Sequence, residues 1–317
     1  MYNNTGAVLR ADLNLVLEEA SQSTSLFIGQ TLAPVFGVDY KAGQYAKITR
    51  QTGELMKAGG VERAPFGGYS RVTRAYTSDS YLTTERGLEE QIDDSQRKEV
   101  ARYFAVEAVA ARNILRAMQL AHEIRVADLV FNSNNWNTTT SSVALTETTA
   151  QDGTFDFPKL VLEAQNRLLK KGVPYNTLVL SQENYNIIRR SPKLQTFLYG
   201  NLPSGQYRLV TAQDLATALN IPNVLIASAT QDTAGKGKAP VLSNVYSNEY
   251  MWLGQVAGGD FSAGGALRTL VWNAEGGIFV TESYRNEELR SDIVRVRHST
   301  VEKVIDSTAA ELIDLNG

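Results

Sequence analysis

The sequence predicts an α+β protein that is organised around one long helix. The first observation is the stretch from Asp93 to Asn132, which is rich in Ala and contains neither Gly nor Pro. The second is a glycine-rich excursion between Tyr40 and Asp93, which contains two runs of β-branched and aromatic residues. The third is strand–helix–strand alternation from Thr177 to Leu253, which indicates a mixed α/β domain.

The long helix is expected to begin near Asp93, where Asp93, Asp94 and Ser95 offer N-cap side chains and negative charge. Its apolar residues recur at helical spacing, and include Val100, Phe104, Ile114, Leu115, Met118 and Leu129. An unbroken helix of roughly 38 residues is about 57 Å long. A compact body of the whole chain is only about 50 Å across. The sequence therefore favours an elongated protein with a helical spine over a globular enzyme with a long core helix.

Before the helix, the chain is expected to form an amphipathic helical segment at 7–21 and an extended segment at 24–38. The runs 45–50 and 69–76 then predict a long two-stranded loop with a glycine-rich tip. An isolated two-stranded ribbon is only marginally stable in water. The loop could lie on another subunit, or it could be a hairpin packed on its own domain.

After the helix, residues 134–153 are expected to form a loop or a short polar hairpin. Helices are predicted at 155–171, from Ser181 to before Pro192, and from the capping box at Thr211 to Leu219, with a loop at 197–206. Strands are predicted at 177–180, 224–227, 241–253, 267–272, 277–284 and 293–298, with loops at 230–240 and 254–265 and a strand-like tail after 301.

Composition narrows the function. The chain of 317 residues has no Cys, which removes disulfides, thiolate nucleophiles and thiolate metal sites. It has 31 basic and 34 acidic residues and a net charge of −3. This balance does not favour strong electrostatic binding of nucleic acid. No apolar run is long enough to span a bilayer and no signal peptide is evident, so we expect a soluble, non-secreted protein without a membrane partner.

Motifs for catalysis, cofactors and metals are missing. The two histidines, His122 and His298, stand at no metal-ligand spacing, and the glycine-rich run 235–238 lacks the spacing of a phosphate-binding loop. The acidic run 85–94 could hold a carboxylate pair, although a solvated face leading into a helix is the more frequent meaning of such a run. We expect no enzyme activity, no cofactor and no metal site.

The order of these elements resembles the major capsid proteins of tailed bacteriophages, a fold shared with encapsulin shells and the herpesvirus capsid floor. Local stretches are similar too, namely YLTTERGLEEQIDD at 81–94 and LVLSQENYNIIRRSP at 178–192. The resemblance implies an N-terminal arm at 1–39, an extended loop at 40–80, a first part of a peripheral domain with the spine helix at 81–171, an axial domain at 172–254 and a second part of the peripheral domain at 255–317. Some relatives crosslink a loop Lys to an Asn, but no motif extends that chemistry to Lys41, Lys47 or Lys57.

The resemblance further implies a structural protein that self-assembles, as pentamers and hexamers, into an icosahedral virion shell around double-stranded DNA that is not bound sequence-specifically. Assembly would take place in the host cytoplasm. Scaffolding, portal or decoration proteins are possible partners. Because the chain starts almost directly at the arm, we expect any scaffold to be a separate protein or to have been removed. Two rivals stay open: an encapsulin-like compartment shell and a soluble α/β enzyme. Five loop residues of types that anchor interfaces are candidate inter-subunit contacts: Lys57, Arg63, Phe66, Tyr69 and Arg71.

Overall fold

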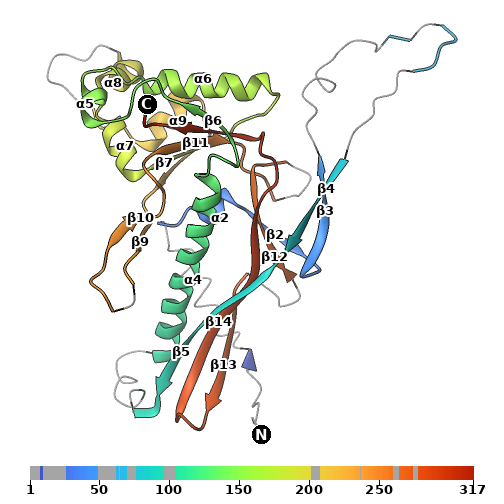
Figure 1. The fold of residues 1–317 in the computed structure, drawn as a ribbon, viewed down its shortest axis with the longest axis vertical. Coiled ribbons are helices and arrows are strands. Elements are labelled where there is room, and N and C mark those ends of the chain that lie inside the picture. The colour runs from blue at the N-terminus through green and yellow to red at the C-terminus, as the bar shows by residue number, and fades with distance from the viewer. Residues whose placement is uncertain are drawn as a thin grey trace.

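The computed structural model describes residues 8–9, 26–48, 62–63, 65–69, 76–95, 97, 105–200, 208–235, 237–259, 264–273 and 278–317, and all structural statements refer to these. The molecule is elongated (Figure 1). Its long helix α4 runs beside a sheet of long strands, an α/β unit caps one end of the helix, and a two-stranded arm leaves the sheet on the side away from α4 (Figure 1).

The helix α4 spans Val106–Val130, which makes it shorter than predicted. Its 25 residues extend about 38 Å. The predicted helix start near Asp93 is close to the structure, because residues 94, 95 and 97 are helical directly after strand β5 (Thr84–Asp93). The predicted continuity from Asp93 to Asn132 is wrong, because Ala105, with φ −73 and ψ 96, is extended immediately before α4. All ten residues of β5 pair with strand β14, so the strand occupies the chain up to Asp93.

The six-stranded sheet lies along α4. Its order is β1-β13-β14-β12-β2, with β5 on the other edge of β14. The strands span Val8–Leu9 (β1), Val35–Val38 (β2), Leu267–Trp272 (β12), Val280–Asn286 (β13) and Ser291–Val304 (β14). The side chains of Ile114 and Met118 in α4 pack with Ile92, Val294 and Val296 of β5 and β14 into one of two buried cores. The sheet and the helix are therefore packed together through one shared core.

The five-stranded sheet lies in the α/β unit and has the order β6-β15-β11-β7-β8. Its strands span Asn137–Thr140 (β6), Thr177–Ser181 (β7), Asn223–Ala227 (β8), Tyr250–Gly254 (β11) and Ala310–Asp314 (β15). The helices around it are α5 (Glu147–Gln151), α6 (Phe157–Lys170), α7 (Gln182–Ile188), α8 (Pro192–Tyr199) and α9 (Ala212–Leu219). Strand β7, which lies between β11 and β8, is buried at every position, and Trp252 of the central strand β11 is fully buried beside Trp136. This is the larger of the two cores.

Local chemistry explains several boundaries of this unit. The Ser181 and Thr211 side chains cap α7 and α9 as the sequence predicts, and Thr211 forms a reciprocal capping box with Asp214. Asn220 ends α9 in the left-handed conformation, with φ 53. A short hairpin of β9 (Thr230–Asp232) and β10 (Leu242–Asn244) projects beside α4 (Figure 1).

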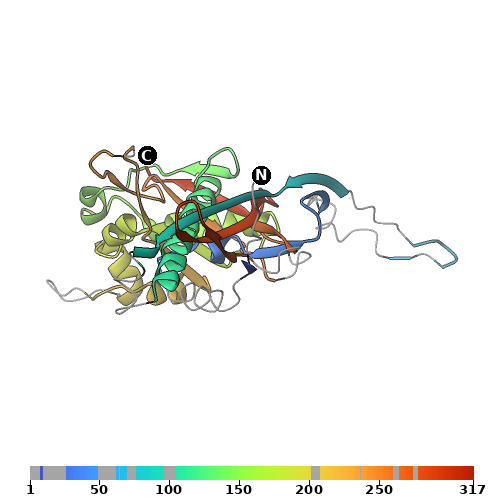
Figure 2. The same cartoon turned by 90° about the horizontal axis from the view of Figure 1, so that it is seen from below.

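The predicted two-stranded loop is present as an arm. Strand β3 (Ala42–Ile48) pairs antiparallel with β4 (Tyr76–Leu82) and with no other strand of the described chain. In Figure 2 the teal strand β4 reaches past the edge of the body. In the described chain the second strand, β4, begins at Tyr76, the last residue of the predicted run 69–76, and continues to Leu82 before leading into β5. Residues 49–61 and 70–75 lie outside the described chain.

Five smaller predictions are wrong in part. Val8 and Leu9, expected to be helical, form strand β1 with β13, whereas residues 10–25 are outside the described chain. The extended segment 24–38 contains the short helix α2 (Gly29–Leu32). Helix α8 continues to Tyr199 within the predicted loop. The polar segment after α4 contains strand β6, which pairs in parallel with β15 near the end of the chain. The predicted loop 230–240 begins with strand β9, which pairs with β10. In both cases a partner strand later in the sequence makes the segment a strand.

Candidate inter-subunit surfaces

The end of the arm exposes an aromatic side chain on a closed turn. Arg63 Nε donates a hydrogen bond to the Gly67 carbonyl at 2.6 Å, and the Arg63 guanidinium lies 5.0 Å from the centre of the Tyr69 ring. Between these residues, Phe66 is fully exposed and has φ 67, a left-handed conformation that is rare for an aromatic residue. The sequence predicted Arg63, Phe66 and Tyr69 as contact residues, and the structure brings them together. Lys57 and Arg71 lie outside the described residues.

The root of the arm is fastened to the body. The Lys41 carbonyl accepts hydrogen bonds from the Thr83 amide at 2.8 Å and from the Thr83 hydroxyl at 3.0 Å. The Lys41 ammonium lies 4.4 Å from the centre of the Trp272 ring, whose Nε1 donates to the Asp39 carbonyl at 3.2 Å. These contacts tie β3 and β4 to β12, so the direction of the arm is set by the sheet.

The segment before β2 is held by a buried carboxylate. Glu123 of α4 accepts hydrogen bonds from the amides of Ile28 and Gly29, at 2.9 and 2.6 Å, and from the Tyr246 hydroxyl at 2.9 Å. Burial raises the pKa of Glu123, although the three hydrogen bonds oppose this shift. Glu123 thus joins three segments that are far apart in the sequence: the base of the N-terminal region, the long helix and the turn before β11.

A second buried charge cluster fixes α4 to β14. Arg125 makes two hydrogen bonds of 3.0 Å to the Glu302 carboxylate, which is buried. His122 Nε2 lies 3.1 Å from the Thr269 hydroxyl, and burial lowers the pKa of His122 to about 4. The imidazole is therefore neutral at pH 7 and serves as a packing and hydrogen-bonding group.

Ion pairs cross the strands of the long sheet. Glu89 of β5 pairs with Arg295 of β14 at 2.5 Å, and Arg297 of β14 pairs with Glu282 of β13 at 2.7 Å. The acidic run thus lies on a largely exposed strand that leads into a helical segment, as the sequence predicts, and its carboxylates pair with arginines on β14. Nothing in the spacing of the acidic residues alone could show this, because their partners lie about two hundred residues later, with a separation of 206 for Glu89 and Arg295.

The sequence reasoning missed Glu123, Glu302 and Glu311, three carboxylates inside the fold. Glu311 is completely buried on β15 and pairs with Arg167 at 2.6 Å and Lys171 at 3.1 Å. The sequence contains a weak signal for two of them. Glu123 and Glu311 stand within apolar runs, at positions where the spacing of the apolar residues predicts a buried side chain. In the described chain, no group of three or more His, Asp or Glu could hold a metal ion, and no helix is long and apolar enough to cross a membrane.

Comparison with known proteins shows which proteins share this architecture. No family model matches the sequence. The "Major capsid protein" of Burkholderia phage BcepMu is 27% identical over 207 residues, and the match spans 64% of each chain, less than two thirds of that relative.

Solved structures match over nearly the whole chain. A phage-related protein from Bordetella bronchiseptica RB50 has a TM-score of 0.71, with 19% identity over 98% of both chains. The capsid structure of Cyanophage P-SCSP1u has a TM-score of 0.56 and 9% identity, over 89% of this chain and 86% of that one. The long helix packed on sheets, the α/β unit and the projecting arm all lie within the matched span. This chain therefore has the major capsid protein fold of tailed bacteriophages.

Proposed function

We propose that the chain is the major capsid protein of a tailed bacteriophage, a structural subunit that assembles into an icosahedral shell around double-stranded DNA. The observation that carries this proposal is the projecting arm. Strands β3 and β4 pair only with each other in the described chain, and the turn at the arm's end exposes Phe66 completely. Such a ribbon gains its stability from a surface that it covers, and the body of its own chain does not supply that surface.

The partners follow from this role. The copies form pentamers and hexamers, and scaffolding, portal or decoration proteins join them as separate chains. A net charge of −3 is consistent with a shell subunit that encloses DNA without binding it tightly. The protein is then a component of the virion, assembled in the host cytoplasm, and its role is structural rather than catalytic.

The domain division at 172 and 254 is also part of the proposal. The five-stranded sheet that would form the axial domain recruits β6 and β15 from outside these limits. We therefore place residues 137–140 and 310–314, together with α5 and α6, in the axial domain. The six-stranded sheet and α4 form the peripheral domain.

The experiment is assembly of the expressed full chain, followed by light scattering and negative-stain electron microscopy. We expect pentamers, hexamers or closed shells. Compact species of about 35 kDa under every assembly condition would contradict the proposal, with the mass taken from the 34.8 kDa chain. Particles from infected cells that enclose nuclease-protected double-stranded DNA distinguish a capsid from a compartment shell, which would enclose a protein cargo.

A further inference from the structure

Two arginines on the exposed side of α4 have no carboxylate partner in the described chain. Arg112 and Arg116 are exposed on successive turns of the helix, and neither forms an ion pair with another described residue. Four arginines on α4 and the neighbouring sheet are, in contrast, each paired with a carboxylate: Arg125, Arg285, Arg295 and Arg297. Like charges four residues apart in a helix repel each other. An anionic partner would relieve this repulsion between Arg112 and Arg116.

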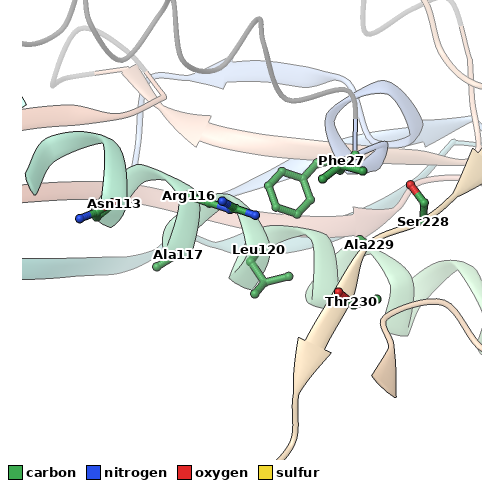
Figure 3. Close-up of a pocket in the computed structure, with 9 residues that line it drawn as sticks. Phe27, Asn113, Arg116, Ala117, Leu120, Ser228, Ala229 and Thr230 are labelled. Carbon is green, nitrogen blue, oxygen red and sulfur yellow. The ribbon is translucent and has the colours of Figure 1, made fainter. Parts of the chain in front are cut away.

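A pocket of about 310 Å³ beside Arg116 is bounded in part by side chains that can donate hydrogen bonds. These donors are Arg116 and Asn113 of α4, and Ser228 and Thr230 of the segment that leads into β9, whereas the other lining residues, such as Phe27, are apolar. Figure 3 shows the two helix residues on one side of the pocket and the segment with Ser228 and Thr230 on another. Guanidinium, amide and hydroxyl groups are typical protein contacts to phosphate oxygens. Donors from two separate elements can therefore bind a phosphate group here.

The turn at the end of the β9–β10 hairpin adds a third cation. The Lys238 amide donates a hydrogen bond to the Gly235 carbonyl at 3.0 Å, and Gly237 has φ 82. A Cβ built on either glycine would meet nothing within 4 Å, so the turn is not packed on the described chain. Lys238 is exposed and forms no ion pair with a described residue. Strand β9 starts at the pocket and the hairpin projects beside α4, so Lys238 lies on the same side of the molecule as the two arginines (Figure 1).

Acidic side chains near these cations have other partners. Asp232 of the hairpin accepts hydrogen bonds through Oδ1 from the amides of Ala234 and Val241, at 2.9 and 2.8 Å. Glu107, in the first turn of α4, pairs with Arg97 at 3.2 Å. The positive charge of the two helix arginines and the hairpin lysine is therefore left uncompensated by the described chain.

Duplex DNA is the anion that fits this surface. Arg112 and Arg116 are separated by about 6 Å along the helix axis, and one DNA strand carries a phosphate about every 3.4 Å of duplex axis. Both arginines can therefore pair with phosphates of a single strand. Contacts of Arg, Lys, Asn, Ser and Thr side chains to phosphates position a protein on DNA without reading its sequence. A shell that encloses DNA of any sequence requires contacts of this type.

We propose that Arg112, Arg116 and Lys238 bind phosphates of the enclosed duplex DNA. The proposal rests on the shell function and adds to it the side of the subunit that faces the interior, namely the exposed side of α4 with the β9–β10 hairpin. Three cations in each copy bind DNA only weakly, but every copy in the shell repeats the same contact. Weak, repeated contacts are consistent with the net charge of −3.

The first test measures how DNA binding by the unassembled full chain depends on salt, with a fluorescent duplex of mixed sequence as the probe. Each phosphate contact contributes about −0.9 to the slope of log K against log salt concentration. Compared with the wild type, Arg112→Gln/Arg116→Gln should make the slope shallower by about 1.8, and Lys238→Gln by about 0.9. The matched control is Lys159→Gln/Lys170→Gln, which removes two exposed cations from α6 and should leave the slope unchanged.

Circular dichroism verifies that each variant is folded. Equal slopes for the wild type and Arg112→Gln/Arg116→Gln would overturn the proposal. Tighter binding of polyglutamate than of the duplex would also overturn it, because the surface would then favour an acidic protein segment over DNA. A wild-type chain that never assembles would overturn the shell function, whereas the slopes would still decide whether these cations bind DNA.

The second test locates the contact inside DNA-filled particles. Because the chain has no Cys, Asn113→Cys provides a unique thiol, and a photoactivatable group on it should crosslink to the enclosed DNA after irradiation. The matched control is Gln91→Cys. Gln91 is exposed on the sheet face away from α4, because its neighbour Ile92 packs into the core shared with α4 and successive side chains of a strand alternate between faces. Crosslinking from Asn113→Cys alone is expected, and equal crosslinking from both positions, or from the control alone, would overturn the proposal.

Discussion

Glu123 is the side chain on which the position of the N-terminal region most depends. Its carboxylate accepts hydrogen bonds from three donors. Two of these are the backbone amides of residues 28 and 29, so this segment stays against α4 only while the two bonds are kept. A Cβ built on Gly29 would lie 2.5 Å from Glu123 Oε2, so the close approach also needs glycine at this position. A buried charge that is matched by donors is costly to alter, because its partners stay buried.

We expect Glu123→Gln to destabilise the folded subunit by about 1–3 kcal/mol, because the amide nitrogen would face a backbone N–H where the carboxylate accepts it. Urea denaturation of unassembled protein measures the change. The matched control is Glu163→Gln, at a half-exposed position on α6, which should stay within about 0.5 kcal/mol of the wild type. Equal stability of both variants would show that the carboxylate does not secure this segment.

His298 makes the subunit sensitive to mild acid. Its ring stacks on Phe279 at 5.2 Å, neither of its nitrogens has a hydrogen-bond partner among the described residues, and burial lowers its pKa to about 4. The unfolded chain, with an ordinary pKa near 6.5, therefore binds a proton in a pH range where the folded chain does not. The stability contributed by the neutral ring is present above pH 6.5 and is lost as the pH falls from 6.5 towards 4.

Replacing His298 by Phe should keep the ring stack and remove this titration. On going from pH 7 to pH 5, the variant should lose about 2 kcal/mol less unfolding free energy than the wild type. Urea denaturation of unassembled protein at the two pH values gives the comparison. The same loss in both proteins would mean that His298 titrates normally in the folded state.

At the scale of elements, local chemistry predicted most of the α/β unit and failed where partners are distant. Caps at Ser181 and Thr211, together with the apolar runs of β7 and β8, act within a few residues and could be seen in the sequence. Strand β5 could not, because its alternation is masked by charged residues whose partners are arginines on β14. The same holds for the candidate site: exposed anchor residues on the arm could be predicted, whereas the pocket on α4 needs three separated segments to be brought together.

The arm itself is predicted to be an assembly element rather than a folding element. Replacing residues 53–69 by a short turn should leave the body folded, because none of the residues of this stretch that the structure describes belongs to either buried core, and should abolish shell formation. Circular dichroism beside negative-stain microscopy tests both parts. Normal shells from this variant would make the arm dispensable. Failure to fold would show that the hairpin is packed in its own domain, the alternative that the sequence leaves open.

For the whole molecule, the sequence predicted an elongated protein for a reason that was only half correct. The helix is shorter than expected, with 25 residues, yet the molecule is elongated because strand β14, with 14 residues, continues along it and the arm leaves its neighbour β12. Elongation therefore comes from the sheet as much as from the helix. Long pairings such as β5 with β14 depend on contacts between residues about two hundred positions apart, and a single sequence contains no local signal for them.

The position of β15 has a consequence for how the protein is made. This strand lies between β6 and β11, and Asn137 of β6 and Glu311 of β15 are 174 residues apart in the chain. All four other strands of the sheet leave the ribosome before it does. A nascent chain therefore carries an unfinished sheet in two pieces until residue 314 has emerged, and its folding must be completed after translation of that strand.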